Sequence, residues 1–551
     1  MAVESPYDAV IVGSGAGGAA AAWRLCTHGL NVLILEAGPR FDPATDYPLT
    51  NPDWERRPFP AKPGSTGAVS YGDLGVLEEA DANLASWNSA RGKHVNSAVR
   101  VPSAAGYSHV QGVGGSTLHY VGEAHRLHPN AMRLRTEHGA GADWPLSFSD
   151  LEPFYVACET EIGVAGAPAA GPRWPAVDHL QPAHPLSTSA RVLREAGARL
   201  GMVWENNTRA ALSVPKDDRP ICNYCGNCAR GCPLGDKGSA DVTFLRKAEA
   251  TGRLTIHSGA QVTRVIMGPD GRVRAVSGVR DGAGFEQETP ILILAGGAVQ
   301  TPRLLLASDT KGGGLANNSG QVGRNFMETL TWTSAGLLPG LSSSHKGLPA
   351  DAVSWTFNAP GAVDGVVGGC RFTASTLETG LMGPVAYASR VMDGYGAAFK
   401  AQLRRAMGSA IAVSATGETI PDERSFVALD PDRVDAAGVP FAQINSVLTD
   451  NSLALLRFMA GQCRALLAEA GVPEPGEETG VWDSFNATHV FGTCRMGTEP
   501  AQAVVDAHGR AHDIDNLFVA DASVFPSSGG GEAPSLTIQA LALRMADRLV
   551  Q

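Results

Sequence analysis

Residues 7–36 read YDAVIVGSGAGGAAAAWRLCTHGLNVLILE and decide the fold. The short apolar run at 7–12 is typical of a strand buried on both faces in a parallel sheet. The alanine-rich stretch that ends at His28 predicts a helix, Gly29 predicts its end, and residues 31–35 predict a second strand. The segment therefore predicts one β-α-β unit of a Rossmann-like sheet.

The glycines of this unit each suit a step in dinucleotide binding. Gly13 permits the tight turn, Gly15 lets a pyrophosphate approach the backbone, and Gly18 lets the helix pack on the strand. The helix N-terminus favours the phosphates, and Glu36 stands where a carboxylate accepts the ribose hydroxyl protons. We expect a dinucleotide site; the alternative is a glycine-rich turn with a structural role only.

Later segments favour FAD over a nicotinamide cofactor. A second glycine-rich loop occupies residues 112–117, and a predicted strand at 516–520 leads into an Asp-Ala-Ser sequence. FAD is long enough to need several separated contacts. The further cofactor-binding candidates are Gly112, Gly114, Gly115, Ser116, Val262, Asp521 and Ala522.

Composition places the chain among large globular proteins. It has 551 residues, 44 Lys and Arg against 55 Asp and Glu, and a net charge of −11. An acidic chain without a basic block has nothing to neutralise nucleic-acid phosphates. No run is long and apolar enough to span a membrane. Residues 1–6 lack a basic export-signal region, so we expect a cytoplasmic protein.

The segments between the glycine motifs suit a second domain. They are richer in polar loops and in alternating patterns, such as SFVAL at 425–429. We expect an α/β protein with a discontinuous, Rossmann-like FAD-binding domain and a substrate domain that is α+β with a mostly antiparallel sheet. The expected FAD-binding ranges are 1–143, 220–325 and 482–551, and the expected substrate-binding ranges are 144–219 and 326–481.

Four of the nine cysteines form a cluster at Cys222, Cys225, Cys228 and Cys232. Their C-x2-C-x2-C-x3-C-P spacing is that of bacterial ferredoxins, which hold iron–sulphur clusters. Structural zinc, disulfides and free thiols are the alternatives. The isolated cysteines are expected to be small core residues; they are Cys26, Cys158, Cys370, Cys463 and Cys494.

Ordered motifs along the whole chain resemble those of the glucose-methanol-choline (GMC) oxidoreductases. They are GSGAGG with Glu36, GVGGST at 112–117, DWPLSFSDLEPFY at 143–155, LAGGAVQTPRLLLAS at 294–308, VGRNFM at 322–327, HVFGTCRMG at 489–497 and NLFVADASVFP at 516–526. The resemblance implies oxidation of an alcohol carbon by hydride transfer to flavin N5.

The cysteine run resembles one subgroup of that family. Cys222, Cys228 and Cys232 keep the C-x5-C-x3-C spacing of bacterial flavin-dependent glucose dehydrogenases. This resemblance implies a three-iron cluster, with Cys225 as an additional ligand if four irons are held. It also implies a small companion subunit and a cytochrome as electron acceptor.

The resemblance assigns the catalytic base to His489, whose ordinary pKa near neutrality suits proton transfer. The family usually places a second His or Asn about forty residues later, where this chain has Ala533. The neighbouring Glu532, or water, is the candidate replacement. His125 and His128 are expected to be surface or loop residues.

Two further residues concern the flavin ring. Pro534 is expected to begin the final helix, with Thr537 in its first turn, so that the helix N-terminus points at flavin N1/O2. The loop before His119 resembles the pyranose oxidase loop that carries flavin covalently, although we expect noncovalent packing here.

Four functions remain open at this point. They are a dehydrogenase that passes electrons through a cluster, an oxidase that uses oxygen, a lyase and a non-catalytic electron carrier. A one-electron cluster beside a two-electron flavin favours the dehydrogenase, and His489 argues against the carrier. The expected substrate is an alcohol group on a sugar, glycoside, aminocyclitol or polyol.

Overall fold

The computed structural model describes residues 6–47, 69–71, 79–90, 92–93, 109–167, 180–308, 313–482 and 489–551. Residues 1–5, on which the prediction about an export signal rests, lie outside these ranges. None of the helices found in these ranges is long and apolar enough to cross a membrane.

The predicted β-α-β unit is present. Strand β1 (Ala9–Val12) leads into helix α1 (Ala16–Thr27), and β2 (Val32–Leu35) pairs with β1 in parallel. The helix ends where Gly29 adopts a left-handed φ of 93°, which glycine reaches without steric cost. Every residue of β2 is buried, as the continuous apolar run predicts.

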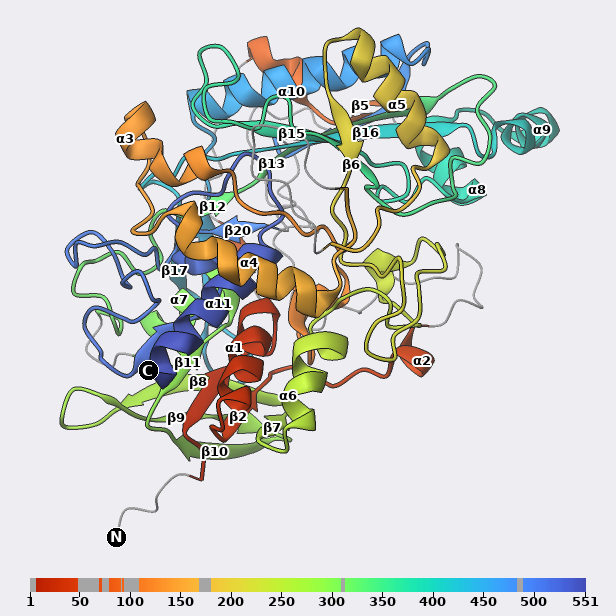
Figure 1. Ribbon diagram of the computed structural model, residues 1–551. Helices are drawn as coiled ribbons and strands as arrows, with labels where there is room; N and C mark the ends of the chain where they lie inside the picture. Colours follow the sequence, from red (N-terminus) through yellow and green to blue (C-terminus); the bar gives the residue numbers. More distant parts are fainter. Residues whose placement is uncertain are drawn as a thin grey trace.

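A five-stranded parallel sheet is built around this unit in the order β21-β11-β1-β2-β7. The added strands are β7 (Leu254–His257), β11 (Leu292–Leu294) and β21 (Leu517–Val519). Parallel strands place their carboxyl ends at one edge of the sheet, where doubly wound folds bind their ligands. This part occupies the lower half of Figure 1.

An eight-stranded antiparallel sheet forms the upper half (Figure 1). In spatial order its strands are β5 (Gly92–Lys93), β4 (Trp87–Asn88), β19 (Pro475–Gly480), β13 (Leu330–Leu337), β16 (Ala410–Gly417), β15 (Cys370–Ala374), β14 (Ala352–Ser354) and β6 (Trp204–Asn206). Helices α10 (Asp450–Glu469) and α5 (Thr188–Arg199) pack against it. The fold class predicted from the sequence is confirmed.

The remaining strands and helices complete the two parts. The strands are β3 (Val69–Tyr71), β8 (Ala260–Met267), β9 (Val273–Arg280), β10 (Ala283–Glu288), β12 (Met327–Glu328), β17 (Phe426–Val434), β18 (Pro440–Asn445) and β20 (Val490–Phe491). The remaining α-helices are α2 (Pro43–Asp46), α3 (Leu134–His138), α4 (Phe148–Ile162), α6 (Arg246–Ala250), α7 (Gly297–Ser308), α8 (Pro384–Ala386), α9 (Gly396–Ala406) and α11 (Ser535–Val550).

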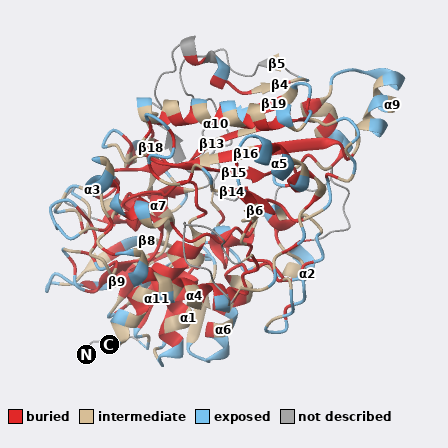
Figure 2. Ribbon diagram, turned by 45° about the horizontal axis from the view of Figure 1, so that its top comes forward, coloured by how far each residue is buried: buried red, intermediate tan, exposed pale blue. Residues whose placement is uncertain are grey.

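Each large sheet has its own hydrophobic core. One core surrounds the parallel sheet with α1 and α11, and the other lies between the antiparallel sheet and α10. Figure 2 shows buried residues concentrated in the sheets, whereas α9 is largely exposed. The five isolated cysteines are buried, as expected for core residues.

Helix α4 packs against α11 in the Rossmann-like part, although its sequence lies in the range expected for the substrate domain. A capping box at Ser147 and Asp150 starts α4. Tyr155 Oη then lies 2.9 Å from Thr537 Oγ1 of α11. The domain limits remain a prediction.

Candidate active site

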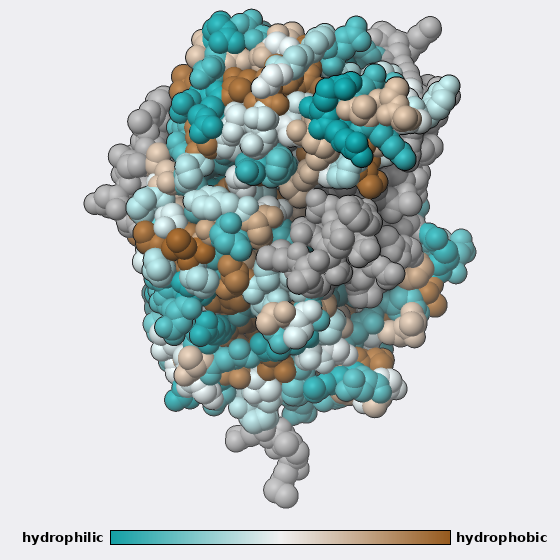
Figure 3. Space-filling model, turned by 90° about the vertical axis from the view of Figure 1, so that its right-hand side faces the viewer, coloured by the Kyte–Doolittle hydropathy of each residue, from teal (hydrophilic) through white to brown (hydrophobic). Residues whose placement is uncertain are grey.

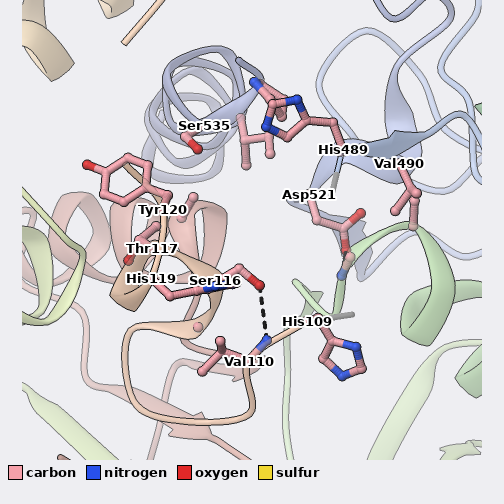
Figure 4. Close-up of a pocket in the computed structure, with 18 of the residues that line it drawn as sticks. His109, Val110, Ser116, Thr117, His119, Tyr120, His489, Val490, Asp521 and Ser535 are labelled. Carbon is pink, nitrogen blue, oxygen red and sulfur yellow. Dashed lines mark hydrogen bonds between the residues drawn. The ribbon is translucent and has the colours of Figure 1, made fainter. Parts of the chain in front are cut away.

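A cavity of about 740 Å³ lies between the carboxyl edge of the parallel sheet and the antiparallel sheet. Its wall includes the two glycine-rich loops, His489 and strands of the upper sheet. Figure 4 shows the segment from Ser116 to Tyr120 on one side, with His489 and Asp521 on the other. One continuous space therefore joins the nucleotide motifs to the expected catalytic residue.

The two glycine-rich loops meet at the cavity wall. Gly13 has a φ of 99°, and an added Cβ would lie 2.6 Å from the Ala295 carbonyl oxygen. A Cβ on Gly115 would lie 2.6 Å from Gly15 Cα. Side chains at these positions would close the cradle, so the loops fit the close backbone approach that a pyrophosphate requires.

The Glu36 carboxylate lies at the end of β2 and lines the cavity. One oxygen accepts hydrogen bonds from Ser14 N at 3.0 Å and Ser14 Oγ at 2.7 Å, and the other accepts from Gly38 N at 2.9 Å. Burial raises the pKa of Glu36, and these hydrogen bonds oppose the rise. The carboxylate is held in the place expected for a ribose contact.

The other predicted cofactor residues divide into two groups. Those that line the cavity are Ser116, His119, Val262, Asp521, Ala522 and Pro534. Those that support its wall from behind are Gly18, Gly112 and Gly114. A Cβ on Gly18 would lie 2.1 Å from the Gly13 carbonyl oxygen, so Gly18 serves packing.

Two expectations about the final helix need correction. Helix α11 begins at Ser535, and Pro534 is the residue before it. Thr537 points away from the cavity into the α4–α11 contact, because its hydroxyl pairs with Tyr155. Ser535 and Ile538 line the cavity in its place.

His489 precedes β20, and its carbonyl accepts a hydrogen bond from Thr329 N at 3.1 Å. The half-buried imidazole lines the cavity. Burial and the positive charge of Arg371 lower the pKa of His489 to about 4, although Glu123 opposes them. The imidazole is therefore neutral near pH 7, as a general base must be.

Ala533 also lines the cavity, and its N–H donates to His125 Nδ1 at 3.0 Å. His125 lies in a loop, as one of the two expected alternatives has it, but it is fully buried and not a surface residue. Asn207 uses its Nδ2 protons on Glu123 and the Ala350 carbonyl. Its Oδ1, 2.8 Å from His125 Nε2, must then accept a proton from that nitrogen. His125 is thus the neutral Nε2–H tautomer, with both nitrogens occupied.

Glu123 and Arg371 form a buried ion pair in the cavity wall that the sequence did not indicate. Two parallel hydrogen bonds of 2.7 Å join the guanidinium to the carboxylate. Arg371 Nε also donates to the Gly531 carbonyl. Burial raises the pKa of Glu123, but the positive charges of Arg371 and Arg209 outweigh it and hold that pKa well below its ordinary value.

Glu532 is buried, and its Oε1 accepts from His128 N at 3.2 Å and Asn358 Nδ2 at 2.9 Å. Glu532 is not among the described residues that line the cavity, whereas its neighbour Ala533 and Arg371 are. The structure thus separates Glu532 from His489, which the sequence had paired as catalytic candidates.

The antiparallel sheet presents hydroxyl groups to the cavity. The hydroxyl face consists of Thr331, Thr333, Thr373, Ser414, Thr416 and Thr479. Strand register brings them together, because Thr331 lies opposite Thr416 and Thr333 lies opposite Ser414. The Thr333 and Ser414 hydroxyl oxygens are 2.6 Å apart. Such a face suits a ligand with many hydroxyl groups.

The cysteine loop borders the same cavity, because Ala229 between Cys228 and Arg230 lines it. All nine cysteines are free, so none forms a disulfide. Cys232 Sγ donates to Asp236 Oδ1 at 2.9 Å, and Cys222 Sγ accepts from Tyr224 N at 3.4 Å. In the described ranges, no three His, Cys, Asp or Glu side chains converge to hold a single metal ion.

Lys237 connects the cysteine loop to the second glycine-rich loop. Its buried ammonium donates to the carbonyls of Leu118 at 2.8 Å, Tyr120 at 2.9 Å and Cys228 at 2.9 Å. Burial raises the pKa of Cys232 to about 12, with Asp236 adding to it and Lys237 opposing it. The Cys232 thiol is therefore protonated at neutral pH.

Comparison with known proteins agrees with this fold and site. Family models described as GMC oxidoreductase match residues 175–331 and 421–542, together about half of the chain. A model of an NAD(P)-binding Rossmann-like domain matches residues 11–42. The fold and the site are those of an FAD-dependent oxidoreductase that acts on alcohol groups. The chain belongs to the GMC oxidoreductase family.

Three curated relatives match nearly end to end. The 2-methyl-1,2-propanediol dehydrogenase of Mycolicibacterium austroafricanum is 28% identical over 98% of this chain and 94% of its own. The 6'''-hydroxyparomomycin C oxidase of Streptomyces lividus is 29% identical over 98% and 90%. The fructose dehydrogenase large subunit of Gluconobacter japonicus is 28% identical over 98% and 97%.

Solved structures share the fold at low sequence identity. The pyridoxine 4-oxidase from Mesorbium loti superposes with a TM-score of 0.61 at 19% identity. The match covers 98% of this chain and 99% of that one.

Proposed function

We propose that this protein is a dehydrogenase that oxidises a hydroxyl group of a sugar, glycoside, aminocyclitol or polyol. It passes the electrons through an iron–sulphur cluster to an external acceptor. One observation carries the proposal: His489, the hydroxyl face and Ala229 of the cysteine loop line the same cavity as the nucleotide-binding glycines.

When bound, FAD supplies the hydride acceptor. His489 takes the hydroxyl proton, since its imidazole is neutral near pH 7. Arg371 donates to the substrate oxygen in the place of the side chain that Ala533 lacks. Its two terminal nitrogens each give one proton to Glu123, which leaves one N–H on each for the cavity. The positive end of α11 stabilises further negative charge there.

The chemistry of the cavity wall supports a polyhydroxylated substrate. Hydroxyl side chains both donate and accept hydrogen bonds, so the hydroxyl face would match a ring or chain of hydroxyl groups. A sterol would need a wide apolar wall instead. The named substrates of two relatives, a diol and fructose, agree with a polar substrate.

The residues around the cysteine loop fit an anionic cluster. Cys222, Cys225, Cys228 and Cys232 would hold it, and it would supply a one-electron relay. Each thiolate of a cluster binds a different iron, so the sulphurs need not converge on one point. The buried cations Arg209, Arg219 and Lys237 donate to main-chain carbonyls. The charges of Lys237 and Arg209 favour the thiolate form of Cys228, as ligation of a cluster requires.

Anaerobic purification followed by iron analysis and electron paramagnetic resonance tests the cluster. We expect bound iron and a cluster signal whose intensity changes when dithionite is added. Cys228→Ser should remove the signal and electron flow to an external acceptor, yet spare flavin reduction by substrate. Cys26→Ala, outside the loop, is the matched control. Flavin bands with no iron would refute the cluster.

An oxidase is the second candidate, with the cysteine loop purely structural. It is favoured by the hydrogen bond from Cys232 to Asp236, which satisfies this thiol without a metal. The oxidase would release one peroxide for each alcohol oxidised in air. The dehydrogenase would reduce a dye or cytochrome and leave oxygen almost unused.

We also propose a companion subunit or a cytochrome as partner at the cysteine loop. Four exposed apolar side chains lie in or beside the motif; they are Val214, Ile221, Tyr224 and Leu234. Figure 3 shows the right-hand side of the view in Figure 1, where apolar residues are scattered among hydrophilic ones. The relative named a large subunit agrees with such a partner. A cytoplasmic location remains a prediction.

A further inference from the structure

Glu378 is a charged residue of the cavity wall that the mechanism does not use. It lies in the turn that follows β15 and lines the cavity. No hydrogen bond or ion pair joins its carboxylate to another residue in the described part of the chain. A carboxylate with no such partner in a substrate cavity can bind a ligand group of opposite charge.

The environment of Glu378 places its carboxylate on an inner surface. The side chain is exposed by area and lines the cavity. Desolvation by the surrounding protein nevertheless raises its pKa to about 7, with Glu123 adding to the rise and Arg371 and Arg209 opposing it. The geometry therefore leaves the Glu378 side chain open to a ligand in the cavity.

The neighbouring cations Arg371 and Arg209 oppose the rise in the pKa of Glu378, but in the described part of the chain no hydrogen bond or ion pair joins either of them to its carboxylate. Arg371 is held by two hydrogen bonds to Glu123 and a third to the Gly531 carbonyl. Arg209 donates to the carbonyls of Val121 and Ala350. Both cations are oriented by these partners, so the carboxylate of Glu378 keeps its capacity to accept.

We propose that Glu378 binds an ammonium group of a polyhydroxylated substrate, whose hydroxyl groups contact the hydroxyl face. This inference rests on the proposed function, because it assigns a substrate subsite in the same cavity. Glu378 is then a specificity-determining residue that favours amino sugars and aminocyclitols over neutral sugars. The hydroxyl group to be oxidised is presented to His489, and the ammonium group is held at Glu378.

An ammonium group fits this position better than a neutral hydroxyl group does. A ligand that enters the cavity displaces water from this carboxylate, which is costly unless a cation and hydrogen bonds replace that water. A bound ammonium also favours the ionised form of Glu378, whereas a second anion would be repelled by Glu123 as well. The relative that oxidises an aminoglycoside has a substrate of this chemical class by its name.

Calorimetric titration of the FAD-loaded protein with 2-deoxystreptamine tests the subsite without turnover. Its di-N-acetyl derivative keeps the hydroxyl groups and loses both charges. We expect the wild type to bind the amine about tenfold or more tightly than the acetylated form. Glu378→Gln should remove most of that difference, and Glu499→Gln, an exposed carboxylate outside the cavity wall, should keep it.

The outcomes separate the two proposals. Equal affinity of the wild type for both ligands, or an unchanged preference in a folded Glu378→Gln variant, would overturn the ammonium subsite. Anaerobic flavin reduction by neutral sugars and polyols would in that case still support the proposed function. Preferential binding of the amine with no flavin reduction by any alcohol would instead refute the proposed function and retain the subsite.

Discussion

At the scale of single residues, the charges around His489 set its chemistry. The imidazole lies in a desolvated cavity with Arg371 near enough to disfavour a second positive charge. The negative charge of Glu123 raises the pKa of His489, but burial and Arg371 together lower it by more. A base that is neutral throughout the physiological range is the consequence.

The first prediction concerns pH. With saturating substrate, the limiting rate of flavin reduction should be flat from about pH 8 to about pH 5 and fall only as pH approaches about 4. Neutral His489 is the active form, and protonation through its lowered pKa removes it. Anaerobic stopped-flow absorbance measures this rate. A midpoint near the ordinary histidine value of 6.5 would contradict the assignment.

The second prediction concerns Arg371. Arg371→Met should lower the limiting rate about 100-fold, because the substrate oxygen loses a preorganised donor as negative charge develops on it. FAD should remain bound, since the glycine cradle and Glu36 are untouched. Arg404→Met, on exposed helix α9, is the matched control. An unchanged limiting rate would place Arg371 in a purely structural role.

These residues differ in how far the sequence predicts them. His489 and Glu36 stand beside motifs whose local order is informative. Glu123, Arg371 and His125 have no such flanking pattern, and their roles arise only when strands and loops distant in the chain meet. Ala533 is a similar case. The sequence shows that the usual polar side chain is missing there, but it does not show that the Arg371 guanidinium lines the same cavity.

At the scale of elements, helix α1 depends on glycine for close packing. A Cβ on Gly17 would lie 1.7 Å from the Ala520 carbonyl oxygen and 3.0 Å from Ile538 of α11. Carbonyl oxygens of the backbone cannot move aside cheaply. The contact of α1 with α11 and with the end of β21 therefore requires glycine at this position.

The third prediction compares two helical glycines. Gly17→Ala should lower the free energy of unfolding by about 3 kcal/mol and weaken FAD binding, because α1 must move from the cavity edge. Gly461 in α10 has open space where a Cβ would lie, so Gly461→Ala should raise the free energy of unfolding by about 0.5–1 kcal/mol. Urea unfolding measures both. Equal effects would contradict the packing argument.

Element positions follow the sequence closely where a local pattern is strong. The strand expected at 7–12 is observed at Ala9–Val12, and the strand expected at 516–520 is observed at Leu517–Val519. The sequence of helix α4 does not predict which part of the molecule it joins, because its apolar face does not indicate which partner covers it. Tertiary packing on α11 decides that.

At the scale of the whole molecule, one cavity joins two separate cores. The parallel sheet presents the nucleotide-binding loops. The antiparallel sheet presents the hydroxyl face and Arg371, and the turn after β15 presents Glu378. The cysteine loop closes on the same space at Ala229. Family motifs predict the two sheets, but only the assembled structure places their side chains around one substrate volume.

Anaerobic mixing of the FAD-loaded protein with sugars, polyols and aminocyclitols, followed by flavin absorbance, tests the central claim most directly. The wild type should lose its oxidised flavin band with at least one of them. His489→Gln should bind FAD and keep the band, while His28→Gln on the surface behaves as the wild type does. Reduction of His489→Gln at the wild-type rate, or no reduction of the wild type by any alcohol, would contradict the account.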